Sequence, residues 1–314
     1  MINIIKRKSF KDVLYEWLNY KKQNIKESTY LKYLNQIDVN IIPNIDDISF
    51  KKLNLKHIEK IFNNDNILKL SNSTKNNILI IIKSAITYGI EKKYRKDFDK
   101  IDLKFQKNNN RVCCFSKIEQ KKIIDYINNN MNLRNLLILV TLFTGLRIGE
   151  VCCLKVEDID FLNKTICVNK TVQRIKNTGN GANKTKLVIG KPKTKNSIRV
   201  LPIPNFIINL LKDYTSEKNN YIFTNNDLPK DPRTVEKYFS NLLKKIGIEN
   251  KTFHTLRHSF ATRLMEEKVD IKVISELLGH SDWKITESIY IHATLDYKKN
   301  LINKLENIWN KKSS

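Results

Sequence analysis

Apolar residues recur at spacings of three and four along the first hundred positions, which is the period of an amphipathic α-helix. The apolar stripes lie in four segments, residues 10–18, 30–37, 55–62 and 78–86. Ser28 is a possible cap of the second segment, and the third and fourth helices are expected to follow Asn54 and Ser73. The pattern therefore predicts an all-helical N-terminal domain over residues 1–98.

A polar stretch without periodicity, residues 99–111, predicts a linker. After it, Ser116 and Glu119 have the spacing of a capping box at the start of a helix. A further helix from Asn135 to about Phe143 is apolar on most faces, so we expect it to be buried. These features predict a second domain over residues 112–314.

The period changes between about residues 165 and 203. Three segments there are rich in β-branched residues and are separated by glycine and proline, namely residues 165–172, 186–189 and 197–201. They predict a small antiparallel β-sheet. Helices resume afterwards, because Asp231 and Pro232 form a helix start and Gly247 a helix stop. The predicted fold is mainly α with a small antiparallel sheet, of the α+β class.

The charge of the chain predicts a polyanionic partner. The 57 lysines and arginines exceed the 32 acidic residues and give a formal net charge of +25. Both predicted domains carry a basic excess, so a long nucleic acid that contacts both is the simplest interpretation. A generally lysine-rich surface that only keeps the protein soluble is the alternative.

The cysteines and the apolar runs indicate where the protein works. Two adjacent cysteine pairs and a lone Cys167 show no C-x-x-C spacing, which favours a reducing compartment without a zinc ribbon. No apolar run is long enough for a signal peptide or a membrane span. We therefore expect a cytoplasmic protein, associated with the nucleoid, that does not bind membranes.

Several polar residues stand where they could form one site. Arg147 lies between Gly145 and Gly149 at the end of the buried helix, where a charged side chain needs a partner. His254 and Arg257 share one helical face, and so do His254 and His258. Two histidines at this spacing also occur in zinc proteases, but the glutamate of that motif is replaced here by Thr255, so we expect no metal.

Three further residues are candidates that have simpler explanations when each is taken alone. His280 follows the predicted helix stop Gly279 and points into a cleft or caps the helix dipole. Tyr290 lies among isoleucines, where a tyrosine is ordinarily a core residue. Lys193 lies in the turn between the last two predicted strands.

From Phe10 to about Tyr297 the chain resembles the tyrosine recombinases, also called the phage integrase family. The family's boxes match four segments in the family's order, residues 144–150, 254–257, 278–280 and 289–292. One such box is a weak match, but four in order are specific. The resemblance implies a core-binding domain and a catalytic domain that form a C-shaped clamp on DNA.

The resemblance implies that the enzyme cuts and rejoins DNA through a 3′-phosphotyrosine. Tyr290 would be the nucleophile, and Lys193 on a mobile hairpin would protonate the departing 5′-oxygen, with Lys191 and Lys195 as alternatives. Arg147 and Arg257 would stabilise the charge that grows on the phosphate oxygens.

Three more residues complete the implied site. His254 would act as the base or hydrogen-bond partner of the tyrosine, and His280 would donate to a non-bridging phosphate oxygen. Glu150 would support the site by orienting the arginine and histidine side chains. No ATP and no cofactor is expected, since the phosphotyrosine conserves the bond energy.

The implied partners are double-stranded DNA at core sites and further copies of the chain in a tetramer on paired sites, with an accessory directionality factor or a host DNA-bending factor. The amphipathic segment 300–309 would bind the neighbouring protomer or pack on its own domain. Integration or excision of a mobile element is the expected role. The alternatives are a Xer-type resolvase, a type IB topoisomerase, an inactive DNA-binding relative and an unrelated RNA-binding protein.

Overall fold

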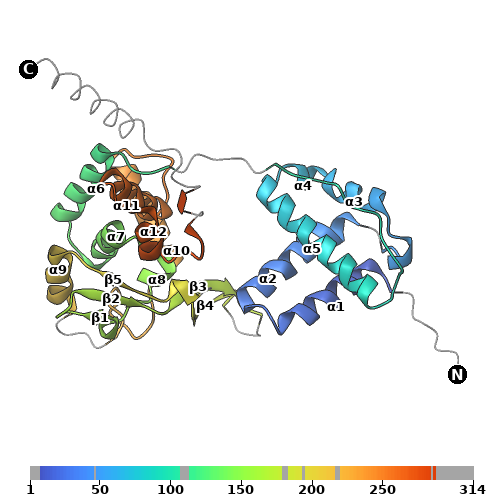
Figure 1. Cartoon of the computed structure of the whole chain (residues 1–314), viewed down its shortest axis with the longest axis horizontal. Helices are drawn as coiled ribbons and strands as arrows, with labels where there is room; N and C mark the ends of the chain where they lie inside the picture. The colour runs from blue at the N-terminus through green and yellow to red at the C-terminus, as the bar shows by residue number, and fades with distance from the viewer. Residues whose placement is uncertain are drawn as a thin grey trace, which may run out of the picture. The chain divides into compact units, whose positions relative to one another are not determined.

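The computed structural model describes residues 8–45, 47–106, 113–178, 183–192, 195–215, 220–283 and 286–287. The chain divides into two compact units, residues 1–110 and residues 111–314 (Figure 1). Each unit has its own hydrophobic core. The expected fold class is confirmed, because the described residues are mostly helical and their strands pair antiparallel.

The first unit is helical, as predicted. Its α-helices are α1 (Phe10–Lys22), α2 (Glu27–Gln36), α3 (Leu55–Phe62), α4 (Asp65–Leu68) and α5 (Asn72–Glu91). Short π or 3₁₀ turns occur at Ile37–Ile41, Ile42–Asn44 and Phe50–Lys52. Helix α1 packs against α5, and the core receives its predicted apolar stripe of Phe10, Val13, Leu14, Trp17 and Leu18.

Of the three predicted helix starts in this unit, one is confirmed and two lie earlier in the structure. Asn54 caps α3, since its side chain accepts a hydrogen bond from the backbone of His57. Helix α5 is capped by Ser71, whose hydroxyl accepts from the amide of Thr74 at 3.2 Å, and Ser73 lies inside the first turn. Helix α2 begins at Glu27, one residue before Ser28. A serine pattern alone does not decide which hydroxyl reaches an unpaired amide.

Part of the segment predicted as a linker packs on the first unit. Ile101 is buried there, and the rings of Phe62 and Phe105 lie 4.9 Å apart. The side-chain amide of Asn76 also donates to the carbonyl of Phe105 at 2.7 Å. The chain therefore stays on this unit as far as Phe105.

The second unit combines helices with short strands. Its α-helices are α6 (Lys117–Asn129), α7 (Leu133–Thr144), α8 (Ile148–Val151), α9 (Asn205–Thr215), α10 (Pro232–Lys245), α11 (His254–Glu266) and α12 (Ile271–Leu278). Its strands are β1 (Ile159–Asp160), β2 (Thr165–Val168), β3 (Thr171–Lys176), β4 (Thr185–Gly190) and β5 (Arg199–Pro202), and 3₁₀ turns occur at Val156–Asp158 and Lys195–Ser197. Ser116 and Glu119 form the predicted capping box of α6.

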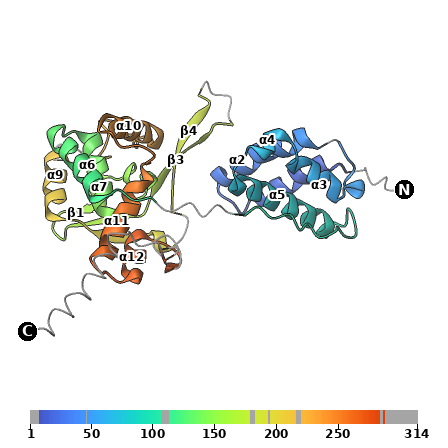
Figure 2. The same ribbon diagram turned by 90° about the horizontal axis from the view of Figure 1, so that it is seen from above.

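The strands form two separate sheets, not the single sheet predicted. One has the order β1-β2-β5, and the other is a β3-β4 hairpin that extends from the body of the second unit (Figure 2). Since β4 pairs with β3 and β5 pairs with β2, the segment between β4 and β5 crosses from one sheet to the other. Lys193, which was expected in the turn between the last two strands, lies outside the described residues.

Helix α7 is the centre of the second core, as its apolar sequence predicted. Residues 136–142 are nearly or completely buried, and α7 packs against α11, α6 and α9. The helix ends at Gly145, which has a left-handed φ of 65°. A side chain at Gly145 would lie 2.5 Å from the ring of Phe260, so glycine is needed for space as well as for conformation. Among the helices that the structure describes, none is long and apolar enough to cross a bilayer.

We expect Gly89→Ala to destabilise the first unit, although alanine is the better helix former. Gly89 is buried in α5, and a β-carbon there would lie 2.5 Å from the ring of Phe50. Overpacking of this kind costs about 1–3 kcal/mol in unfolding free energy. Denaturant unfolding measures the loss, with Lys83→Ala at an exposed position of the same helix as the control. A Gly89→Ala protein as stable as the control would contradict the tight packing of α5 on Phe50.

Candidate active site

Arg147 and Glu150 form a local unit at the start of α8. The Glu150 carboxylate accepts from the backbone amide of Arg147 at 3.0 Å and from its Nη1 at 2.8 Å. The Nη2 of Arg147 donates to the carbonyl of Gly279 at 3.1 Å. The Arg147 side chain remains 35% exposed, whereas that of Glu150 is 3% exposed. The buried carboxylate of Glu150 thus fixes the Arg147 side chain and leaves part of it accessible to solvent.

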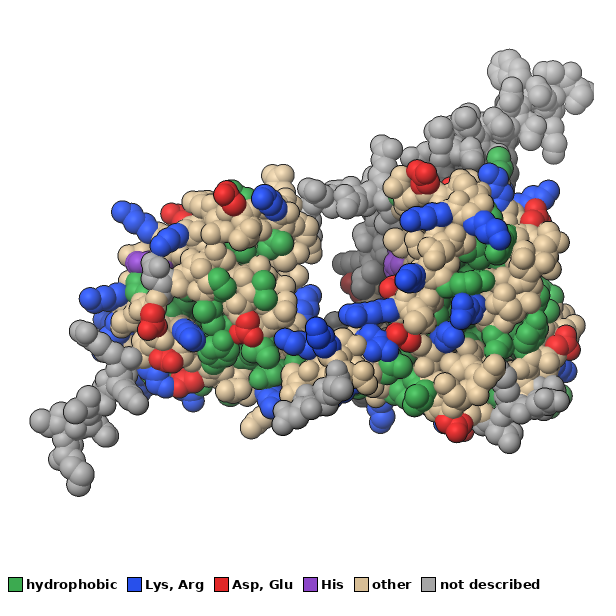
Figure 3. Space-filling model, turned by 180° about the vertical axis from the view of Figure 1, so that it is seen from behind, with side chains coloured by type: hydrophobic (Ala, Val, Ile, Leu, Met, Phe, Trp, Pro, Cys, Tyr) green, Lys and Arg blue, Asp and Glu red, His purple; other side chains and the backbone are tan. Residues whose placement is uncertain are grey.

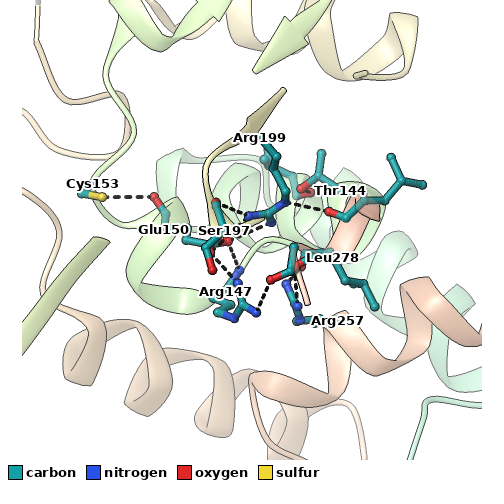
Figure 4. Close-up of polar contacts among 12 residues, drawn as sticks. Thr144, Arg147, Glu150, Cys153, Ser197, Arg199, Arg257 and Leu278 are labelled. Carbon is teal, nitrogen blue, oxygen red and sulfur yellow. Dashed lines mark hydrogen bonds and ion pairs between the residues drawn. The ribbon is translucent and has the colours of Figure 1, made fainter. Parts of the chain in front are cut away.

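Arg199, at the start of β5, is a second partner of Glu150 and was not predicted. Its Nη2 lies 3.0 Å from Glu150 Oε2, and its Nη1 lies 3.3 Å from Oε1 (Figure 4). Burial by itself would raise the pKa of Glu150, but the hydrogen bonds and charges of Arg199 and Arg147 lower it below its ordinary value. Glu150 is therefore an ionised carboxylate shared by two arginines.

A sequence signal for Arg199 does exist. Leu201 is buried, and Arg199 shares its face of β5 because side chains alternate along a strand. An arginine on the buried face of a strand needs an acidic partner. The partner lies 49 positions away in sequence, so only the fold identifies it.

Arg257 is buried and connects two helix ends. Its Nη1 donates to the carbonyl of Gly145 at 2.7 Å, and its Nη2 donates to the carbonyl of Leu278 at 2.6 Å (Figure 4). The residue is 2% exposed. Arg257 therefore fixes the end of α7, which precedes Arg147, against the end of α12, which precedes His280.

His254 is the first residue of α11 and is exposed, one turn before Arg257. Neighbouring protein groups reduce the hydration of its ring, and this effect, followed by the charges of Arg257 and Arg147, lowers the pKa of His254 below 6.5. The ring of His258 lies edge-on to it, with ring centres 4.5 Å apart. Burial and the neighbouring His254 and Arg257 lower the pKa of His258 to about 4. Both rings are thus uncharged at neutral pH.

His280 follows Gly279, which ends α12 with a left-handed φ of 63°, as predicted. Its Nδ1 is hydrogen bonded to the hydroxyl of the fully buried Thr286 at 2.8 Å. Burial, and then the charges of Arg257, Arg147 and Arg199, lower the pKa of His280 to about 4. The bond to Thr286 engages Nδ1 and orients the ring.

The structure brings together five of the predicted site residues, namely Arg147, Glu150, His254, Arg257 and His280. They come from α8, α11 and the turn after α12. Lys193 and Tyr290 lie outside the described residues. Within the described ranges, no group of three or more histidine, cysteine or acidic side chains could hold a metal ion.

Positive charge extends beyond this cluster. On the face drawn in Figure 3, lysine and arginine side chains are prominent on both units. The formal net charge of +25 belongs to the whole chain, not to one tail. The cluster therefore belongs to a protein with a basic surface that favours polyanions.

Comparison with known proteins gives matches along both units. The model described as "Phage integrase family" matches residues 115–296, and the model "Phage integrase, N-terminal SAM-like domain" matches residues 9–66. The tyrosine recombinase XerC-like protein of Caldanaerobacter subterraneus subsp. tengcongensis is 28% identical over 95% of this chain and 83% of its own length. The integrase of Staphylococcus phage L54a is 29% identical over 97% of this chain and 89% of its own length.

The fold also matches a solved structure. The Tn1549 transposon integrase in complex with transposon right end DNA superimposes with a TM-score of 0.78, covering 95% of this chain and 100% of that chain. Its sequence is 21% identical, so this match supports the fold alone. Because the "Phage integrase family" model matches more than half of the chain, the protein belongs to the phage integrase family, the tyrosine recombinases, which are DNA strand-transferring enzymes.

Proposed function

We propose that this tyrosine recombinase integrates and excises a mobile element by cutting and rejoining double-stranded DNA at specific core sites. The convergence of Arg147, Arg257, His254 and His280, with Arg147 paired to the buried Glu150, is the observation that carries the proposal. The similarity to a phage integrase over 97% of this chain supports the mobile-element role. The XerC-like relative supports a Xer-type resolvase as the second candidate.

Arg147 and Arg257 would bind the phosphate at the cleavage point. Negative charge grows on its non-bridging oxygens as the nucleophile approaches, and guanidinium groups held in place stabilise that charge without reorganising. Hydrogen bonds to Glu150 and to helix-end carbonyls already hold both side chains. His280 would add a hydrogen bond to a phosphate oxygen through Nε2.

Tyr290 would attack phosphorus and form a 3′-phosphotyrosine, releasing a 5′-hydroxyl. A phenol ionises near pH 10, so the attacking tyrosine must lose its proton during the step. His254 would accept that proton, since its lowered pKa keeps the ring neutral at pH 7. Lys193, or its neighbours Lys191 or Lys195, would donate a proton to the departing 5′-oxygen. Reversal of these steps on a second strand completes the exchange without ATP.

Assembly into a tetramer on paired sites would use an apolar groove of about 500 Å³ on the second unit. The groove lies between α7, α11 and the end of β5, and its apolar lining includes Phe143, Ile203, Phe260, Leu264 and Leu277. Segment 300–309 carries Leu301, Ile302, Leu305, Ile308 and Trp309 at helical spacing. We propose that this segment of one protomer occupies the groove of the next. Accessory or host DNA-bending factors at the nucleoid would set the direction of recombination.

A nicked suicide duplex that carries the element's end tests the nucleophile. Tyr290→Phe should bind this DNA as wild type does but form no denaturant-resistant, protease-sensitive adduct, because the phenolic oxygen is missing. Tyr297→Phe is the matched control and should form the adduct. An adduct that persists in Tyr290→Phe would assign the role to another residue.

The pH dependence of cleavage tests His254. Because its pKa lies below 6.5, the neutral ring predominates at pH 7, and single-turnover cleavage should fall only as the pH drops below that value. His254→Gln should lower the rate by about 10²–10⁴-fold and abolish this acidic limb. His57→Gln in the first unit should leave the profile unchanged. An acidic limb that remains in His254→Gln would belong to another group.

Truncation after Asn300 tests the assembly. The shortened protein should bind a single core site normally but fail to pair two sites, as seen by native gel electrophoresis. Leu305→Asp should reproduce this defect, and Glu306→Ala should not. Synapsis by the truncated protein would refute binding of the segment to a neighbouring protomer, and relaxation of supercoils without synapsis would favour a topoisomerase.

A further inference from the structure

Arg199 is nearly buried but has no part in the reaction as proposed above. Its side chain is 7% exposed and faces the 3% exposed carboxylate of Glu150. Burying an arginine this deeply is unfavourable unless hydrogen bonds and an opposite charge compensate for the lost hydration. The structure provides both the hydrogen bonds and the opposite charge. Arg199 is therefore a stable buried charge whose function is still to be assigned.

The guanidinium of Arg199 joins three segments of the second unit. Its Nε donates to the carbonyl of Leu277 at 2.8 Å, at the end of α12. Its Nη1 donates to the carbonyl of Ser197 at 3.1 Å, just before β5. Together with the bonds to Glu150 on α8, these contacts connect the Arg147 segment, the His280 turn and the strand that follows the predicted lysine loop (Figure 4).

Arg147, Arg199 and Glu150 together carry a net positive charge that favours binding of an anion. Glu150 alone would neutralise Arg147, because their side chains are paired at 2.8 Å. With Arg199 on the same carboxylate, the three groups retain one net positive charge. Arg199 thus shares the carboxylate with Arg147 and leaves positive charge for a phosphate next to the more exposed Arg147.

The chain also reserves space for this side chain. A β-carbon at Gly279 would lie 3.0 Å from Cδ and Nη1 of Arg199. Gly279 is therefore required by its left-handed φ of 63° and by the approach of Arg199. A lysine at position 199 could not replace the arginine, since one ammonium group cannot reach all three segments with the same geometry.

We propose that Arg199 is a positioning residue of the recombination reaction. It fixes the position of Glu150 relative to the His280 turn, so that the charge of Arg147 faces the phosphate at the cleavage point. This inference rests on the proposed phosphate-binding role of Arg147. It adds a residue that never contacts the DNA but determines how well the phosphate charge is stabilised.

The test compares Arg199→Met with Arg263→Met in single-turnover cleavage of a nicked duplex. Arg263 is a matched control, because it also bonds a carboxylate and a backbone carbonyl in the same unit but is bound to Gln120, Glu266 and Phe115. Thermal unfolding and DNA binding establish that each variant is folded. Arg199→Met should reduce cleavage of the normal phosphate by about a hundredfold, as expected for a misplaced catalytic group.

A second substrate separates positioning from a general structural effect. A methylphosphonate at the cleavage point carries one negative charge fewer than a phosphate and needs less stabilisation by Arg147, so Arg199→Met should lose less than about tenfold on it relative to wild type. Arg263→Met should change both substrates equally. Arg199→Lys keeps a charge without the fork and should show the same substrate difference at a smaller amplitude. If Arg199→Met does not fold, the substrate difference measured with Arg199→Lys tests the proposal.

Two results would overturn the proposal. Equal losses on both substrates would make Arg199 purely structural, and wild-type cleavage by Arg199→Met would leave it without a role. Failure of the proposed function is recognised separately, since the wild-type protein would then form no Tyr290 adduct with the normal phosphate.

Discussion

The site depends on one buried carboxylate. Glu150 is surrounded by protein and accepts hydrogen bonds from Arg147 on one side and Arg199 on the other. An unpaired charge at this depth would strongly destabilise the fold. The carboxylate of Glu150 therefore keeps both arginine side chains next to it. Because Glu150 lies on α8, Arg199 on β5 and the bound carbonyls at the end of α12, this interaction sets the relative positions of three elements.

Helix ends supply the remaining acceptors. The last carbonyls of an α-helix have no partner within the helix and carry partial negative charge. Here the carbonyls of Gly145, Leu277, Leu278 and Gly279, at the ends of α7 and α12, accept hydrogen bonds from Arg257, Arg199 and Arg147. The two left-handed glycines turn the chain at these points. The arginine side chains repel one another. Hydrogen bonds to these helix-end carbonyls, which have no partner within their helix, hold the arginines together despite that repulsion.

The same arginines determine the state of the histidines. The rings of His254 and His280 lose hydration to the surrounding protein and lie in a positive environment, and both effects oppose protonation. A neutral imidazole can accept a proton at pH 7, whereas an imidazolium cannot. Fixed positive charge and neutral imidazole rings therefore arise from one arrangement.

The sequence was sufficient for the features that depend on neighbours along the chain. The helical period, the capping box of α6, the glycine stop after α12, and the local pairing of Arg147 with Glu150 all follow from residues a few positions apart. The order of its motifs also indicated the family that the comparisons confirm. These features are local, or are recognised from the order of local motifs, so no knowledge of the fold was required.

Only the tertiary structure decided which distant groups meet. Arg199 finds Glu150 across 49 positions, and Phe105 packs on Phe62 inside a segment that looks like a linker. The separation of the strands into two sheets depends on which strand pairs with which, and alternation cannot specify that. The choice of Ser71 over Ser73 depends on where the packed helix begins. The free energy that stabilises these arrangements comes from burial and from pairing between distant residues. The spacing of residues along the chain specifies neither.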